Sequence, residues 1–309
     1  MHPIALKTGL IDIHWYGVLM ALAFLVSLLS CIYLGRKVGK DAGFMSDLIT
    51  WIMISSIIGA RLAHVIANSR QYIANPISVL YIHEGGLIYY GGFAGAAIGI
   101  ILFARSRGES LLKLYDIVVV ALPFSHALGR LGCFLNGCCF GTPTQSAIGV
   151  VYPLTSEVGV SHFHDNLIKN SEVMNLMGHL NLRSQQTVDR FREKLAGLVN
   201  EGTVTPDQAA CIPVHPVQLY EAALNVALSL GLLWYFKRKK YDGSVVATYL
   251  LGYSVIRYSV EFTRGDDRMS ALAGLNMAQV ESMVMFAGGI AGWIWLINRE
   301  RTKAGRLQG

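Results

Sequence analysis

The stretch from His126 to Gly141 combines one arginine, one asparagine and three cysteines with four glycines, and it continues the apolar run Ile117–Leu128. Because that run is expected to lie in a membrane, Arg130 is expected at or just inside a bilayer boundary. A cation there costs about 2.5–3.5 kcal/mol on insertion scales, which favours a functional role. The planar guanidinium of Arg130, with Asn136 nearby, is suited to binding an anionic head group. The alternative is a structural arginine that extends to a lipid phosphate.

A second group of polar residues lies in an apolar run closer to the C-terminus. The residues are spaced at helical intervals and share one face of the predicted helix. They are Tyr253, Arg257, Glu261 and Arg264. An Arg257–Glu261 pair that only neutralises itself is the structural alternative. However, Arg130 and Arg257 come from separate runs at the same expected depth, and two like charges there need an anion between them. A lipid phosphate is the abundant candidate.

Three more stretches carry candidate binding residues. The segment His215–Glu221 opens an apolar run, so Gln218 and Glu221 are expected to face neighbouring helices, and His215 is a further candidate. Tyr16 lies at the start of the first run, and Tyr90 lies beside two glycine pairs at the start of another. An aromatic belt at the membrane surface is the structural alternative for both tyrosines. Arg61 is a further charged residue inside an apolar run.

The composition indicates that the elements carrying these residues are embedded in a membrane. The chain has 309 residues, of which 53% are hydrophobic and only 15% are charged, and its mean hydropathy is +0.43. Soluble domains are typically about 25% charged. The formal net charge of +6 does not imply nucleic-acid binding, because the basic residues cluster beside apolar runs. The N-terminus lacks the pattern of a cleaved signal peptide, and none is expected.

Seven apolar runs are each close to the length of about 20 residues that crosses a bilayer. They are approximately His14–Leu34, Leu48–Ala67, Gly85–Ala104, the run from Ile117 into the arginine motif, Pro216–Phe236, Val245–Phe262 and Met277–Ile297. Basic clusters follow the first, third, fifth and seventh runs, so all four clusters fall on one side of the membrane. The positive-inside rule then places the N-terminus outside and the C-terminus inside. Arg130, His215 and Glu261 consequently all lie toward the outer leaflet.

The polar segment Thr142–Pro213 is predicted to form a small periplasmic head that is partly helical. Between Ser184 and Asn200 its apolar residues recur at helical spacing. We expect an amphipathic helix packed on its neighbours, and a helix lying on the membrane is the alternative. The predicted fold is therefore an all-α integral membrane protein with about seven transmembrane helices. The chain is predicted to have three parts. Residues 1–141 form four transmembrane helices with the lipid-binding motif, residues 142–213 form the head insertion, and residues 214–309 form three transmembrane helices.

Four of the five cysteines fall on the predicted outer side, where disulfides persist. A bridge from Cys138 or Cys139 to Cys211 would tie the head to the arginine motif. A zinc site that includes His126 or His215 is the alternative, but the spacing matches no standard zinc pattern, so no metal is predicted. A thiol oxidoreductase using the adjacent cysteines is disfavoured, because the chain contains no C-x-x-C motif.

Five motifs in order resemble bacterial prolipoprotein diacylglyceryl transferases over nearly the whole chain. They are His14-Trp15-Tyr16-Gly17, the glycine pairs Gly85-Gly86 and Gly91-Gly92, Gly129-Arg130-Leu131-Gly132-x-Phe134-x-Asn136-Gly137, His215-Pro216-x-Gln218-Leu219-Tyr220-Glu221, and Tyr253-x-x-x-Arg257-x-x-x-Glu261-Phe262-x-Arg264. The resemblance implies a multi-pass enzyme of the bacterial inner membrane without a cofactor. Such an enzyme moves the diacylglyceryl group of phosphatidylglycerol to the lipobox cysteine of a prolipoprotein and releases glycerol-1-phosphate.

The resemblance and this chemistry together suggest roles for the polar residues. Arg130 and Arg257 are suited to hold the leaving phosphate. The expected catalytic residues are Arg130, Arg257, Glu261 and Tyr90, and the expected lipid-binding residues are Tyr16, Arg61, Asn136, Gly141, His215, Gln218, Tyr253 and Arg264. The chain departs from the family pattern at Cys133, Cys138 and Tyr90, where the family commonly has Asn, Glu and His. The competing hypothesis is a non-catalytic lipid-binding or transport protein with the same fold.

Overall fold

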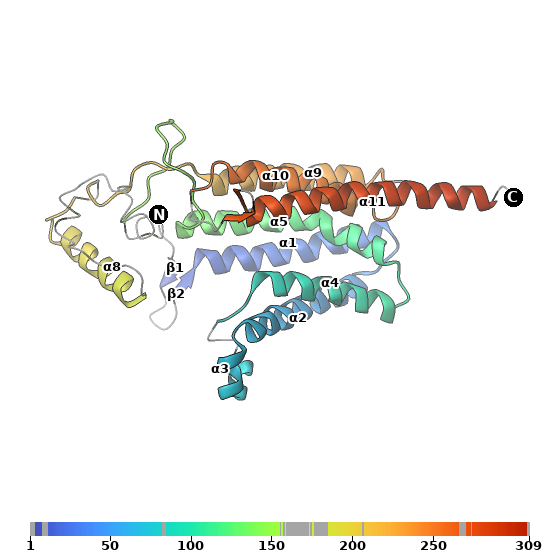
Figure 1. Cartoon of the computed structure of the whole chain (residues 1–309), viewed down its shortest axis with the longest axis horizontal. Coiled ribbons are helices and arrows are strands. Elements are labelled where there is room, and N and C mark those ends of the chain that lie inside the picture. The colour runs from blue at the N-terminus through green and yellow to red at the C-terminus, as the bar shows by residue number, and fades with distance from the viewer. Residues whose placement is uncertain are drawn as a thin grey trace. The chain divides into compact units, whose positions relative to one another are not determined.

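The structure is a computed structural model of the chain, described for residues 4–7, 12–81, 85–154, 156, 158, 173, 175, 185–205, 207–265, 270–272 and 274–307. Its helices are α1 Trp15–Lys37, α2 Ala42–Ala67, α3 Ser69–Ala74, the 3₁₀ helix η1 Pro76–Leu80, α4 Tyr89–Ser106, α5 Leu111–Asn136, α8 Gln185–Asn200, α9 Val217–Phe236, α10 Ser244–Glu261 and α11 Met277–Leu307 (Figure 1). Two short antiparallel pairs complete the described elements: β1 Ile4–Lys7 with β2 Asp12–His14, and β3 Ser270–Leu272 with β4 Leu275–Asn276.

The long helices coincide with the predicted apolar runs, which confirms a helical membrane protein. Five of them are long and apolar enough to cross a membrane, namely α1, α2, α5, α9 and α11. The two others, α4 and α10, are 18 residues each and are not among these five. Four glycines interrupt the apolar residues of α4, and Arg257 and Glu261 lie in α10. Seven crossings and their orientation therefore stay predictions.

The contacts within the chain define two compact units, each built from three stretches of sequence. The first unit comprises Met1–Phe24, Pro123–Gly231 and Leu250–Ala291, and the second comprises Leu25–Leu122, Leu232–Tyr249 and Gly292–Gly309. The linear division into 1–141, 142–213 and 214–309 stays a prediction. Nearly all the residues expected to bind or react lie in the first unit, and Arg61 and Tyr90 lie in the second.

In the second unit, glycines let α2 and α4 approach closely. A Cβ atom added to Gly59 would lie 2.3 Å from the carbonyl oxygen of Gly91 and 2.8 Å from the Cα of Gly95. A Cβ on Gly99 would likewise lie 2.1 Å from the hydroxyl of Ser55. Small residues on a shared face are the usual basis of helix association in lipid, where burial of apolar surface gives no advantage. The glycines at intervals of four in α4 thus select α2 as its partner.

A buried carboxylate organises the other end of the second unit. Asp116 in α5 is fully buried and accepts hydrogen bonds from the backbone N–H of Gly243 at 2.8 Å and of Val246 at 3.0 Å. The ammonium of Lys239 lies 2.6 Å from the same carboxylate. These groups precede or begin α10, whose N-terminal dipole favours a negative charge. Asp116 therefore fixes the start of α10, the helix that carries Arg257 and Glu261.

The head of the first unit has an apolar core of its own. Phe191 and Leu195 of α8 are buried together with Tyr152, Cys211 and Phe140, the last of which follows the cysteine-rich turn directly. The prediction of an amphipathic helix packed on its neighbours is thus confirmed for the described part of the segment. Ser184, the predicted start of that helix, lies outside the described residues, and α8 is described from Gln185.

Candidate functional site

Arg130, in the last two turns of α5, is paired with a carboxylate from α9. Its Nε lies 2.8 Å from an oxygen of Glu221, whose side chain is 1% exposed. The Nε2 atom of His126, one turn earlier in α5, lies 3.0 Å from the other oxygen of Glu221 and 3.2 Å from the Nε of Arg130. When this nitrogen carries a proton it donates to Glu221, and without the proton it accepts from Arg130. The three side chains therefore form one charged cluster.

The predicted pair of Arg257 and Glu261 on α10 is formed, and a third residue completes it. Glu261 accepts a hydrogen bond from Nη1 of Arg257 and another from the Nδ2 of Asn276 at 2.8 Å. Asn276 also begins α11, where its side chain accepts a bond from the backbone N–H of Gln279. Arg257 is close enough to attract Glu221 as well. The arginines of α5 and α10 therefore act on one carboxylate, and a lipid phosphate between them stays a prediction.

Two aromatic residues border this cluster. The ring of Tyr253 on α10 meets the His126 ring edge to face, with 5.6 Å between ring centroids. Tyr16 on α1 packs against Gly132 so closely that a Cβ on this glycine would lie 2.9 Å from the tyrosine ring. Gly132 therefore keeps the start of α1 in contact with α5. The structure places Tyr16 and Tyr253 at the cluster, and their contact with a lipid stays a prediction.

Gly141 lies where three separate segments cross. Its N–H donates to the carbonyl of His215 at 2.9 Å, and it forms a bridge with Arg264 beyond the end of α10. A Cβ here would lie 2.6 Å from the carbonyl oxygen of His215, so only glycine fits. The imidazole of His215 pairs with the hydroxyl of Tyr220 at 3.2 Å. Gly141 and His215 therefore hold Arg264 near the site through the backbone.

Gln218 holds the turn that follows α5. Its side-chain nitrogen donates to the carbonyl of Cys138 at 2.7 Å and to the hydroxyl of Tyr152 at 3.3 Å. Gln218 is 1% exposed and reaches these groups from the first turn of α9. Burial raises the pKa of Tyr152 to about 12, against the opposing effect of the Gln218 hydrogen bond. In these contacts Gln218 positions protein groups, rather than serving only the lipid as the sequence suggested.

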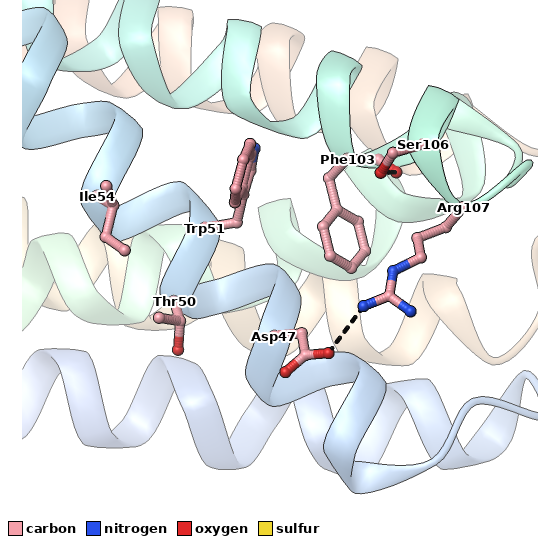
Figure 2. A pocket seen from close by; sticks show the side chains of 7 residues that line it. All are labelled: Asp47, Thr50, Trp51, Ile54, Phe103, Ser106 and Arg107. Atoms are coloured by element: carbon pink, nitrogen blue, oxygen red, sulfur yellow. Dashed lines mark hydrogen bonds and ion pairs between the residues drawn. The ribbon is translucent and has the colours of Figure 1, made fainter.

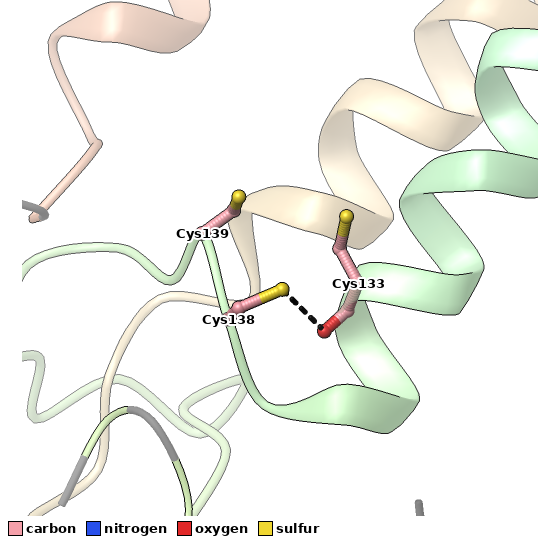
Figure 3. Close-up of side chains that lie close together, drawn as sticks. All are labelled: Cys133, Cys138 and Cys139. Carbon is pink, nitrogen blue, oxygen red and sulfur yellow. Dashed lines mark hydrogen bonds between the residues drawn. The ribbon is translucent and has the colours of Figure 1, made fainter. Parts of the chain in front are cut away.

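The C-terminal end of α5 brings three thiols together (Figure 3). Gly137, at a φ of 73°, donates to the carbonyl of Phe134, and Cys138 donates to that of Cys133, which is a Schellman turn. The sulfur atoms of Cys133, Cys138 and Cys139 all lie within 4.8 Å of one another. Hydrogen bonds from the other two thiols, with Arg264 and Arg130 nearby, lower the pKa of Cys139 despite partial burial. Asn136, the exposed last residue of α5, hydrogen-bonds the thiol of Cys138.

The structure does not form the expected bridge to Cys211. In the described part of the chain, all five cysteines are free thiols. Cys211 is fully buried in the core of the head, and burial raises its pKa to about 12. Cys138 and Cys139 instead face Cys133 at the end of α5 (Figure 3). The predicted pairing was wrong for this structure, because cysteine spacing does not reveal which thiols an apolar core encloses.

Arg61 serves a loop of the second unit instead of an open binding site. Its guanidinium donates to the backbone carbonyls of Ser78, Val79, Tyr81, Gly85 and Gly86 at distances from 2.6 to 3.3 Å. An arginine has five N–H donors, and these five contacts account for that number. Its side chain is buried and lies over the ring of Tyr72. The structure therefore makes Arg61 an anchor for the segment before α4, contrary to the expectation that it binds lipid.

Tyr90 lies in the first turn of α4 and is exposed, and its ring meets that of Tyr89 edge to face, with 5.8 Å between ring centroids.

The second unit also holds a pocket of about 300 Å³ near the start of α2 and the end of α4 (Figure 2). Trp51 and Phe103 line it, together with an ion pair of 3.1 Å between Arg107 and Asp47. None of the expected site residues lines this pocket.

Sequence reasoning missed two members of the charged cluster. It grouped Glu221 with a motif facing neighbouring helices and gave it no partner, and it considered His126 only as a zinc ligand. His126 and Glu221 are separated by 95 residues in sequence, so no local spacing connects them. His126 and Arg130 are, however, four residues apart and share a helix face, which was a usable signal.

Comparison with known proteins gives one consistent result. A family model described as prolipoprotein diacylglyceryl transferase matches residues 3–295. Similar proteins named phosphatidylglycerol–prolipoprotein diacylglyceryl transferase occur in Bordetella avium, with 29% identity over 93% of this chain and 92% of the relative, and in Paraburkholderia phytofirmans, with 31% identity over 97% and 94%. A relative with the same name from Synechococcus elongatus is 30% identical over 97% of this chain and 89% of its own length.

Proposed function

The chain belongs to the prolipoprotein diacylglyceryl transferase family, and we propose that it transfers the diacylglyceryl group of phosphatidylglycerol to the lipobox cysteine of prolipoproteins. The enzyme is a multi-pass membrane protein. We place it in the bacterial inner membrane with seven crossings, the N-terminus outside and the site toward the periplasmic leaflet. Four basic clusters on one side of the predicted crossings support this orientation.

The observation that carries the proposal is the convergence of charged side chains in the first unit. Two guanidinium groups, those of Arg130 and Arg257, meet two carboxylates, Glu221 and Glu261, among the described residues. A phosphodiester head group carries a negative charge, and guanidinium groups that the carboxylates already fix in place can bind it through their remaining N–H donors.

Arg130 can bind this phosphate without losing its carboxylate. The ion pair with Glu221 engages Nε, and the guanidinium carries four further N–H donors on Nη1 and Nη2. Glu261, which Asn276 holds by a hydrogen bond, engages Nη1 of Arg257. Arginine pairs with phosphate through two parallel hydrogen bonds, so fixed guanidinium groups orient the lipid as well as attract it.

The reaction follows from this placement. The thiolate sulfur of the acceptor cysteine attacks the glyceryl carbon that carries the phosphate, and a carbon–sulfur bond forms. The carbon–oxygen bond to phosphate breaks, and its electron pair leaves with glycerol-1-phosphate. The leaving oxygen gains charge in the transition state, where Arg130 and Arg257 stabilise it. The proton of the thiol must be removed beforehand, and Tyr90 is a proposed base.

The remaining site residues shape the pocket for the head group. Tyr16 and Tyr253 border the cluster, Asn136 hydrogen-bonds the thiol of Cys138, and Arg264 adds charge near Cys139. His215, Gln218 and Gly141 hold the turn that follows α5. Their role is to orient the lipid, and Arg61 supports the segment that leads into α4.

The decisive experiment measures whether head-group release depends on the acceptor. The purified chain is incubated with phosphatidylglycerol and either a lipobox peptide or the same peptide with serine in place of cysteine. We expect glycerol phosphate and thioether-linked peptide in equal amounts with the cysteine peptide only. Binding of phosphatidylglycerol without release under both conditions would favour the non-catalytic lipid-binding protein and overturn the proposal.

A further inference from the structure

Three sulfur atoms converge beside the charged cluster. Those of Cys133, Cys138 and Cys139 lie within 4.8 Å of one another, and each residue is partly exposed (Figure 3). Among the described residues, this is the one group of His, Cys, Asp and Glu side chains whose spacing suits a metal ion. The thiols come from the end of α5 and the turn that follows, so one short segment supplies all three.

The protein holds this arrangement at some cost. Cys139 adopts a φ of 58°, in the left-handed region that residues other than glycine rarely enter. Such a conformation costs about 1–2 kcal/mol and persists only where the surroundings enforce it. The carbonyl of Cys138 accepts from Gln218, and the carbonyl of Phe140 accepts from the N–H of Gly265. These bonds on both sides keep Cys139 turned toward the other two thiols.

The spacing and ligand type fit a zinc ion. Zinc–thiolate bonds of about 2.3 Å in a tetrahedron place the sulfurs about 3.8 Å apart. The sulfurs of the three cysteines lie within 4.8 Å of one another, so this separation is within their reach. Three thiolates around Zn²⁺ carry one excess negative charge, and the nearby Arg264 and Arg130 favour negative charge at Cys139. Three protein ligands leave the fourth position of a tetrahedral zinc ion open, which is the arrangement of catalytic zinc sites.

We infer that Cys133, Cys138 and Cys139 bind one Zn²⁺ whose fourth position accepts the cysteine of the prolipoprotein. This inference rests on the proposed function. A thiol that coordinates zinc is deprotonated, so its proton passes to solvent without need of Tyr90 as a base, and the sulfur is held as the nucleophile. The thiolate then attacks the glyceryl carbon, and the electron pair of the broken carbon–oxygen bond leaves on glycerol-1-phosphate, which Arg130 holds.

Metal content and Co²⁺ spectroscopy test the site directly. The full-length chain, purified without added chelator, is expected to contain about one Zn²⁺ per molecule. Cys133→Ser and Cys138→Ser should each lower this content at least about tenfold, because a hydroxyl is a poor zinc ligand. Cys31→Ala, which removes a thiol buried in the second unit, is the matched control and should retain the metal.

Replacement of Zn²⁺ by Co²⁺ in the unmodified chain avoids any effect of mutation on folding. A sulfur-to-cobalt charge-transfer band and intense tetrahedral absorption are expected with about one equivalent of Co²⁺. The absorption should shift when the lipobox peptide is added and stay unchanged with its serine counterpart. Absence of the charge-transfer band, or a metal content that is equal in all cysteine variants, would overturn the inference.

Transfer assays separate this inference from the function on which it rests. Chain stripped of metal should lose transfer at least about a hundredfold and regain it when Zn²⁺ is restored. Full transfer by the metal-free chain would overturn the zinc inference and leave the proposed function standing. A bound zinc ion with no transfer in either form would instead overturn the proposed function.

Discussion

Glu221 on α9 and Arg130 on α5 form an ion pair of 2.8 Å in which the carboxylate is the more enclosed partner, 1% exposed against 15%. Removal of one partner of such a pair leaves a buried, uncompensated charge. Glu221→Gln keeps the shape but not the charge, and it should lower the free energy of unfolding by about 3–5 kcal/mol. Thermal unfolding of the purified chain in detergent measures this loss.

The exposed pair of Asp47 and Arg107 provides the control for this prediction. Its side chains are 60% and 52% exposed, so Asp47→Asn should cost at most about 1 kcal/mol. If the two substitutions lowered stability equally, the Glu221 pair would not be the buried partner described above.

Arg130→Lys should nearly abolish transfer while the chain remains folded. Lysine keeps the charge but not the planar group that binds Glu221 through Nε and phosphate through its other nitrogens. We expect transfer to fall by about 10²–10³, the usual effect of losing one group that stabilises transition-state charge. Thioether formation with a lipobox peptide is the measurement. Arg238→Lys, an exposed residue packed on Trp234, is the control that should transfer normally.

Arg61→Lys should instead act on stability. A lysine has three donors for five carbonyls, and each buried polar group left unpaired costs about 1–3 kcal/mol. The melting temperature should therefore fall, while transfer measured below the transition should change by less than about threefold in molecules that remain folded. A variant that kept its melting temperature but lost transfer would restore the role of Arg61 as a lipid ligand.

Gly59→Ala should separate α2 from α4. The added methyl group would lie 2.3 Å from the carbonyl oxygen of Gly91, and neither backbone can yield without a shift of a whole helix. Overpacking of this kind costs about 1–3 kcal/mol, measurable by thermal unfolding in detergent. Gly231→Ala is the matched control, because a methyl group there meets nothing within 4 Å. Comparable losses in both variants would contradict the close contact.

The head should lose stability at alkaline pH through Cys211. Burial raises the pKa of this thiol from 9.0 to about 12, so the unfolded chain releases the proton before the folded chain does. The free energy of unfolding should therefore fall as pH rises from about 9 to 12. Denaturant unfolding at a series of pH values, followed by circular dichroism, measures the slope. The slope should be smaller in Cys211→Ala, in which Tyr152 still contributes in the same direction.

The sequence predicted the helices well because apolar periodicity and glycine spacing are local signals. It also predicted the Arg257–Glu261 pair, whose members are one turn apart. It missed the Arg130–Glu221 pair, because that contact depends on how α5 and α9 pack. Gly129 and Gly132 lie inside α5, which continues to Asn136. Packing of Tyr16 against Gly132 offsets the low helix propensity of glycine there.

The contacts of Arg61 with backbone carbonyls could not be predicted either, because they also depend on how the chain packs. Burial of an arginine in an apolar run indicates that the guanidinium has partners, but not whether they are lipid phosphates or carbonyls of the same chain. The turn at Gly85 and Gly86, with φ values of 88° and 75°, points two of those carbonyls at Arg61. Nothing in the residue types themselves distinguishes the two outcomes.

The Schellman turn at Gly137 fixes the number of residues between Cys133 and Cys138, because its hydrogen bonds join positions at a set spacing. Insertion or deletion of one residue in Phe134-Leu135-Asn136 would turn the first sulfur by about 100° around the helix axis and leave composition and hydropathy almost unchanged. A related chain that carries all the same cysteines with this interval altered should therefore lack the three-sulfur arrangement, however similar the rest of its sequence.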